Sequence, residues 1–410
     1  MQTYVQRQSI PHGKKSPLAS LSPLRRGALY YFGYLGVLGL FLPFLNLYFR
    51  QELGFSGRQI GLLAIFAPSM TLLFAIPVAS LADRRRWRIR LLTIAISGFG
   101  TMMFLNSIPH TFVFMALLWL ITTATMSPIM PLSDSLIVRM SLRHKLNFGS
   151  MRLWGSCGFA IASAIGGTLW GVLGFSMMFT TTGISLLLVL VLAMHLDEEP
   201  ARDEKNTTKT SLWEICHDTG LIILIGTAFF FGATINMSIV FDGIYISSLG
   251  GTKFLIGIVY SLTALGELPT MQYRDRIAKI CHEPATLLLA CGLLVVSFVG
   301  YFWAWQPWML LFTAATKGLG FGLFLPTAFH FISQRVPEQW SSTVQSIFNA
   351  SMFGAAPLIA APLSGEILDR FSPRAIYACA SITAVGATLL IVTALVCKIF
   401  QHETSRDTQT

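Results

Sequence analysis

The chain contains twelve apolar runs, each long enough to cross a lipid bilayer as an α-helix. A helix needs about 20 apolar residues to span about 30 Å of hydrocarbon. Of the 410 residues, 53% are hydrophobic and 12% are charged, whereas soluble domains have about 25% charged residues. This excludes a soluble enzyme, a disordered chain and a coiled coil. We expect an all-α polytopic membrane protein with transmembrane helices near residues 28–49, 57–82, 89–108, 112–139, 147–172, 174–195, 219–248, 253–274, 284–303, 307–333, 340–366 and 374–400.

The basic residues predict the topology of these helices. If the N-terminus is cytoplasmic, 22 of the 29 Lys and Arg fall on the cytoplasmic face, five on the opposite face and two inside helices. This bias is the positive-inside pattern, and it accounts for the net charge of +10 without a nucleic-acid partner. We expect an integral protein of the cell (inner) membrane with both termini in the cytoplasm.

A polar stretch over residues 196–218 divides the chain into two halves that resemble each other weakly. The Ile-Gly pairs ending at Gly61 and Gly257 are 196 residues apart, and the glycines at 167 and 365 are 198 apart. We expect two pseudo-symmetric six-helix bundles around a central cavity, as in secondary transporters. The predicted segments are an N-terminal tail (1–27), a first bundle (28–195), a cytoplasmic linker (196–218), a second bundle (219–400) and a C-terminal tail (401–410).

Five charged residues fall inside the predicted spans: Asp134, Arg152, Asp242, Glu267 and Lys317. Each charge costs about 2.5–3.5 kcal/mol at the bilayer centre, so we expect these side chains to face the cavity or one another. One alternative is a set of ion pairs that only fix helix packing. The expectation that the side chain faces the cavity or another charge is weakest for Asp242. This residue lies near the outer end of its span, where its side chain could reach water.

The same five residues suggest how transport could be coupled to protons. Three acids and two bases leave a formal charge of −1, which one proton neutralises. Arg152 should lie within pairing reach of Asp134 or Glu267, because a guanidinium cannot lose its proton to escape the bilayer. We therefore expect proton coupling among Glu267, Asp134 and Asp242, with Glu267 as the main carrier and Lys317 competing with the proton for it.

Other motifs indicate packing rather than chemistry. The glycines after Lys317, at 318, 320 and 322, follow no strand and lack a GKS or GKT ending, so they are typical of close helix contacts rather than phosphate binding. The six cysteines form no CxxC pair. We expect no metal and no cofactor, and the absence of HExxH and GxSxG motifs argues against an enzyme.

The segment from Phe148 to Phe159, FGSMRLWGSCGF, resembles the helix 5 motif of the major facilitator superfamily, in its lactose permease, nucleoside:proton symporter and phenylpropionate permease branch. The resemblance covers all twelve helices. It implies that Arg152 binds substrate or pairs with Asp134, and that Glu267 contacts substrate. The segment 79–85, ASLADRR, is similar to the gating motif of the superfamily, which implies a gating role for Asp83 and Arg84.

This chain also departs from that branch. Phe159 replaces the tryptophan that stacks on sugar in lactose permease, and the His and Glu that handle the proton on its helix 10 have no match. We expect a monomeric, proton-coupled importer of a small organic solute, with Arg152, Asp134, Glu267 and Lys317 lining the cavity. Two cations and two aromatic rings, Phe159 and Trp154, favour an aromatic acid. A nucleoside or a sugar, and a proton-driven drug exporter, are the alternatives.

Overall fold

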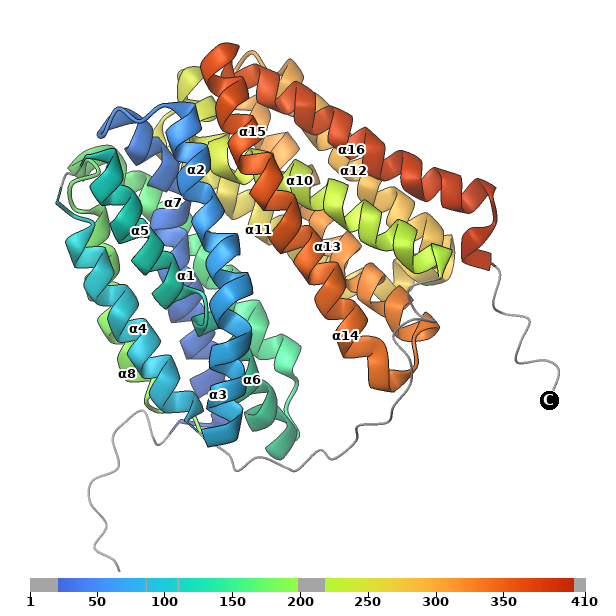
Figure 1. Ribbon diagram of the computed structural model, residues 1–410, viewed down its shortest axis with the longest axis horizontal. Coiled ribbons are helices and arrows are strands. Elements are labelled where there is room, and N and C mark those ends of the chain that lie inside the picture. Colours follow the sequence, from blue (N-terminus) through green and yellow to red (C-terminus); the bar gives the residue numbers. More distant parts are fainter. Residues whose placement is uncertain (1–20, 86, 109–110, 198–217, 402–410) are drawn as a thin grey trace, which may run out of the picture.

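The computed structural model describes residues 21–85, 87–108, 111–197 and 218–401, and the regular elements in these ranges are all helices (Figure 1). The first half consists of α1 (Pro23–Gln51), α2 (Gly57–Met70), η2 (Thr71–Ala75), α3 (Ile76–Arg85), α4 (Arg88–Leu105), α5 (Phe112–Met126), α6 (Ile129–Arg143), α7 (Phe148–Leu173) and α8 (Met178–Ala193). The second half consists of α10 (Thr219–Ser248), α11 (Lys253–Cys281), α12 (Glu283–Trp303), α13 (Met309–Arg335), α14 (Glu338–Asn349), η3 (Ala350–Ala355), α15 (Ala356–Arg370), α16 (Pro373–Val396) and the short η4 (Ile399–Gln401).

These helices confirm the twelve predicted spans. Eleven helical stretches among the described residues are long and apolar enough to cross a membrane, and α8 is a shorter apolar helix of 16 residues. The second span is α2, η2 and α3 in series, the fourth is α5 and α6, and the eleventh is α14, η3 and α15. The predicted linker and both predicted tails lie largely outside the described residues.

Polar side chains at the helix starts explain where several spans begin. A helix leaves its first backbone N–H groups without partners, and a preceding Ser, Thr, Asn or Asp can accept from them. Ser56 caps α2 in a capping box with Gln59, and Asn147 accepts from the amides that open α7. The starts of α10, α11 and α16 are capped in the same way by Asp218, Thr252 and Ser372.

Two spans contain a π-helical segment beside a proline. Pro77 lies two residues after the end of η2, and Pro357 lies two residues after the end of η3. Proline has no N–H group to give to the helical ladder, so the local hydrogen bonding must rearrange. The fourth span is interrupted at Ser127–Pro128, between α5 and α6, for the same reason. Three of the twelve spans are therefore interrupted at or near a proline.

The two halves meet through α2 against α15 and through α7 against α11. Small residues allow the close approach: a Cβ on Gly57 would lie 2.5 Å from the carbonyl oxygen of Gly365, and one on Gly61 would lie 2.6 Å from that of Ala361. At the other interface, a Cβ on Gly257 would overlap the carbonyl oxygen of Ser163. All these contacts lie toward the helix ends that are opposite the linker.

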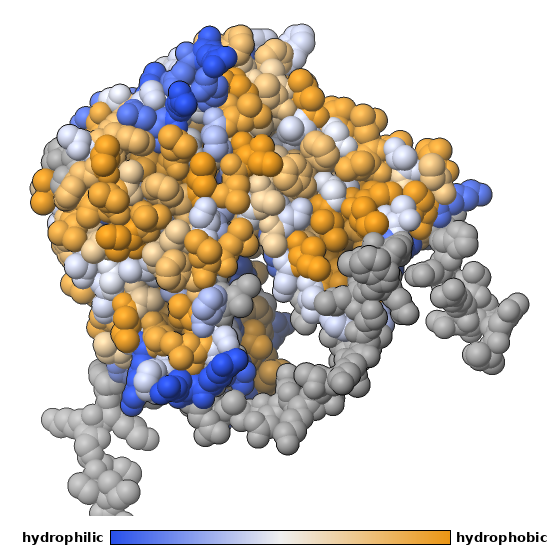
Figure 2. All heavy atoms as spheres, in the orientation of Figure 1, coloured by the Kyte–Doolittle hydropathy of each residue, from blue (hydrophilic) through white to orange (hydrophobic). Residues whose placement is uncertain are grey.

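The surface is consistent with a membrane protein whose halves are apart at one end. Figure 2 shows a broad apolar belt between hydrophilic patches at the two ends of the molecule. It also shows a hollow between the halves at the end where α3, α6 and α14 lie. The halves are therefore closed at the end away from the linker and open at the linker end.

Candidate substrate site

Arg152 and Asp134, which both belong to the first half, form an ion pair. Asn147 starts α7 just before Arg152, while Asp134 lies on α6. The guanidinium Nη1 donates to the carboxylate Oδ1 across 3.0 Å. The side chains remain 45% and 36% exposed, which leaves much of both groups open to a solute. We expected Arg152 to lie within pairing reach of Asp134 or Glu267, and its partner is Asp134.

Tyr31 on α1 completes this group, and the sequence reasoning missed it. Its hydroxyl donates to Oδ1 of Asp134 across 2.5 Å, the same oxygen that Arg152 contacts. The residue is fully buried. Its neighbour Tyr30 forms a hydrogen bond of 2.6 Å with Ser133, the residue before Asp134. Three tyrosines at 30, 31 and 34 in an otherwise apolar span were the available signal, because a buried phenol needs a partner.

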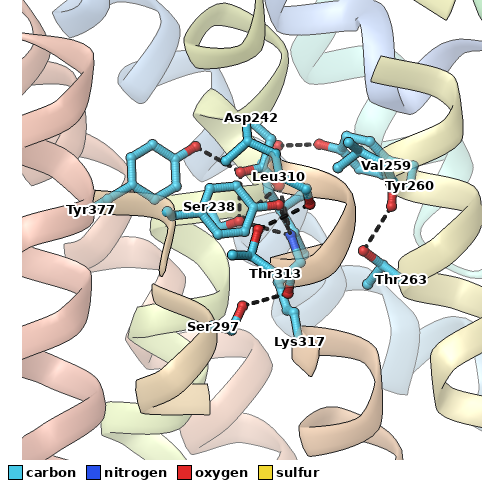
Figure 3. A network of polar contacts seen from close by, with 12 residues as sticks. Ser238, Asp242, Val259, Tyr260, Thr263, Ser297, Leu310, Thr313, Lys317 and Tyr377 are labelled. Atoms are coloured by element: carbon cyan, nitrogen blue, oxygen red, sulfur yellow. Dashed lines mark hydrogen bonds and ion pairs between the residues drawn. The ribbon is translucent and has the colours of Figure 1, made fainter. Parts of the chain in front are cut away.

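A second ion pair lies in the other half, between Asp242 on α10 and Lys317 on α13 (Figure 3). The Lys317 ammonium is 2.7 Å from Oδ2 of Asp242 and 3.0 Å from the hydroxyl of Ser238. Tyr377 donates to the other carboxylate oxygen across 2.6 Å. The Asp242 side chain is 0% exposed and that of Lys317 is 4% exposed.

This second pair corrects two expectations. Asp242 lies six residues before the end of α10, but its side chain is fully enclosed and does not reach water. Lys317 was expected to line the cavity and to compete for Glu267, yet its ammonium is bound by Asp242. The reason is geometric: Tyr377 and Ser238 supply the hydrogen bonds that a buried carboxylate requires.

Aromatic rings surround this pair. The ring of Tyr301 on α12 stacks on that of Tyr377 on α16, with centroids 4.9 Å apart and an interplanar angle of 10°. The Lys317 ammonium lies 5.2 Å from the Tyr301 ring centroid, within range of a cation–π contact. The charge of Lys317 is therefore neutralised within the second half, and a solute in the cavity does not meet it as a free cation.

Glu267, near the middle of α11, has no cationic partner of its own. Its carboxylate makes no hydrogen bond or ion pair with the residues that the structure describes, although the charges of Arg152 and Lys317 act on it electrostatically. Glycines on α13 bring the two helices together here: a Cβ on Gly322 would lie 2.5 Å from the Glu267 carbonyl oxygen. A Cβ on Gly318 would overlap the carbonyl oxygen of Thr263, which confirms that these glycines serve helix packing.

Phe159 and Trp154 lie on different faces of α7. Phe159 is seven residues from Arg152, which is two helical turns, so it shares the face of Arg152, and it is partly buried. Trp154 is two residues from Arg152, about 200° around the helix, and is 52% exposed. The structure therefore brings Phe159, but not Trp154, to the face that carries Arg152.

The gating residues lie at the end of α3. Arg84 is exposed there, on the linker side of the molecule. The side chain of Asp83 lies outside the part of the chain whose side chains are described. A gating role for the two residues stays a prediction.

The architecture of paired helical bundles around a polar, half-exposed site defines a membrane transporter rather than an enzyme. The model of the MFS_1 like family matches residues 24–379. The chain therefore belongs to this family, within the major facilitator superfamily, as the sequence motifs predicted.

Three similar proteins illustrate this relationship. The chain is 29% identical to a maltose permease of Geobacillus stearothermophilus over 89% of its own length and 93% of that protein. It is 25% identical to a probable 3-phenylpropionic acid transporter of Escherichia coli (strain K12), over 82% and 89% of the two chains. The crystal structure of the nucleoside transporter NupG superposes with a TM-score of 0.78 at 14% identity, over 92% of this chain and 99% of that one. The last match concerns the fold alone.

Proposed function

We propose that this protein is a proton-coupled symporter that imports a neutral, hydroxyl-rich solute such as a sugar. The observation that supports this is the charge balance of the accessible site. Arg152 supplies one cation, Asp134 supplies the carboxylate paired with it, and Glu267 supplies a carboxyl group that can carry the proton. Lys317 does not add a second cation to this site, because its ammonium is paired with Asp242 in the interior. Carboxylates and a guanidinium together can accept from and donate to hydroxyl groups.

This charge balance argues against an aromatic acid, which we favoured from the sequence. That preference depended on two free cations, Arg152 and Lys317. With Lys317 neutralised, an anionic solute would meet one guanidinium, that of Arg152, which already has Asp134 as its partner. The similarity to a maltose permease favours a sugar, while the similarity to a probable 3-phenylpropionic acid transporter keeps the acid as the second candidate.

Glu267 is the residue that we assign to the proton. Asp134 and Asp242, which were also expected to take part, already have cationic partners in this conformation. The carboxylate of Glu267 has none, and it is within electrostatic range of Arg152 in the first half and Lys317 in the second, so alternating access would change its surroundings. The positive-inside pattern of basic residues supports a cytoplasmic location for the termini and the linker. In that frame the structure is open to the cytoplasm and closed to the outside, and uptake ends by solute release into the cell.

The experiment is counterflow in liposomes that contain the purified protein. Vesicles preloaded with a candidate solute take up the labelled form by exchange, without any proton gradient. We expect exchange of mono- or disaccharides, and no exchange with Arg152→Ala, which is the matched control. Exchange of 3-phenylpropionate without any sugar would contradict the substrate class. A solute expelled against an inward proton gradient would indicate export.

A further inference from the structure

At the end opposite the linker, Asp369 near the end of α15 contacts the first residues of α2. Its two carboxylate oxygens accept from the backbone N–H groups of Gly57 and Arg58, across 2.7 Å and 2.8 Å. The two segments are more than 300 residues apart and belong to different halves of the molecule. This contact therefore joins the halves directly.

Asp369 satisfies donors that α2 cannot satisfy by itself. The first N–H groups of a helix have no partner within the helix, and they carry the positive end of its dipole. The local cap, Ser56, accepts from Gln59, which leaves the amides of Gly57 and Arg58 unsatisfied by it. A carboxylate at this position is favoured both as an acceptor and as an anion.

The contact depends on how closely the halves approach. Beneath it, Gly57 and Gly365 bring the backbones of α2 and α15 together, because a side chain on either would overlap the other helix. If the halves separated at this end, the carboxylate would lose both amides. The bond can exist only in the conformation that is closed at this face.

At the interface of α7 and α11, the contact between the halves is made by a positive charge at the carboxyl end of a helix. Lys253, the first residue of α11, donates to the carbonyl oxygen of Trp170 across 3.0 Å. Trp170 is among the last four residues of α7, whose carbonyls carry the negative end of the dipole. The same ammonium lies 3.7 Å from the ring centroid of Phe175. Each interface thus places a charge from one half at a helix end of the other half, with the sign that the dipole favours.

We propose that Asp369 is a gating residue of the transport cycle, which stabilises the conformation closed at the outer face by capping α2. The inference rests on alternating access, as in the proposed function, but not on the identity of the solute or on protons. When the outer face opens, the amides of Gly57 and Arg58 must take water in place of the carboxylate. Removing the carboxylate should therefore shift the two access states toward outward-open.

The test measures access to the cavity from each face without any solute. In a chain whose six native cysteines are replaced, Ser156→Cys introduces a thiol one turn after Arg152, on the same face of α7. A membrane-impermeant maleimide is then applied to right-side-out and to inside-out vesicles. We expect Asp369→Ala to raise the labelling rate from the outer face about tenfold and to lower it from the linker face. Asp369→Asn, which keeps an acceptor oxygen but no charge, should give an intermediate shift.

Glu366→Ala is the matched control. Glu366 lies on the same helix, three residues before Asp369, and pairs with Arg370 across 2.6 Å within that helix. Its removal takes away the same charge without touching α2, so both labelling rates should stay unchanged.

Equal rates in Asp369→Ala and Glu366→Ala at both faces would overturn the proposal. If Asp369→Ala is not recovered as a folded protein, Asp369→Asn serves as the test. Unchanged labelling rates in Asp369→Asn would then overturn the proposal. This test is independent of the proposed function. A negative counterflow result would not change the labelling shift expected for Asp369→Ala, and an absent labelling shift would not contradict counterflow of the solute.

Discussion

Lys317 donates a hydrogen bond of 2.7 Å to Asp242 at a point where neither side chain is open to the cavity. A buried ion pair of this kind is expensive to break by removing one partner, since the other charge stays in the interior without compensation. Replacing both partners by apolar or neutral groups can be far less costly.

We predict that Lys317→Met destabilises the protein by about 3–5 kcal/mol, whereas the double variant Asp242→Asn/Lys317→Met recovers most of the loss. The measurement is thermal unfolding in detergent, together with the yield of monodisperse protein. A double variant as unstable as the single one would show that the pair is not what stabilises this region.

Arg152→Ala should abolish solute exchange while leaving folded protein. The guanidinium is 45% exposed, so its loss removes a ligand from the cavity more than it disturbs the core. Exchange in liposomes measures the effect, with Arg370→Ala as the control, because that arginine is 70% exposed at the opposite end of the molecule. Normal exchange by Arg152→Ala would remove this residue from the site.

Tyr31→Phe should raise the solute concentration needed for half-maximal exchange about tenfold, with little change in the maximal rate. The phenol donates to Oδ1 of Asp134, and without it the carboxylate and Arg152 lose their fixed orientation. Tyr34→Phe is the matched control: it is an equally buried tyrosine on the same helix, whose hydroxyl makes no hydrogen bond with the described residues. Equal effects of the two substitutions would point to core packing instead of positioning.

Glu267→Gln should separate exchange from accumulation. The amide mimics the protonated acid, so solute exchange across the membrane should continue, while uptake driven by a proton gradient should be lost. Both assays use the same liposomes, with and without an imposed pH difference. Equal loss of both activities would make Glu267 a solute ligand, and unchanged driven uptake would exclude it from proton coupling.

The substrate class can be tested by ligand stabilisation. A solute at 100 times its dissociation constant should stabilise the folded protein by about 2.7 kcal/mol. We expect sugars to raise the unfolding temperature, and aromatic acids and nucleosides to leave it near that of the unliganded protein. The same screen with Arg152→Ala should show no shift for any solute. A shift with 3-phenylpropionate alone would favour the aromatic acid.

The local features of the fold were readable from the sequence. Each span coincides with its own apolar run, and Pro77 and Pro357 each lie two residues after an irregular segment, η2 and η3 respectively. The ion pair of Arg152 was also predictable, because an arginine in a bilayer needs an acid and Asp134 lies on the preceding span. Hydropathy, proline chemistry and the charge of a guanidinium are properties of single residues and their neighbours in the chain.

The partners of the remaining charges were decided only by the tertiary structure. Lys317 could have paired with Glu267 or Asp242, and the sequence does not distinguish them. The choice depends on how α10, α13 and α16 rotate and pack, which brings Tyr377 to Asp242 from 135 positions away in the chain. The same packing leaves Glu267 without a partner and places Asp369 at the start of α2. The sequence determined which side chains must avoid lipid, and the packing of distant helices determined what each of them meets.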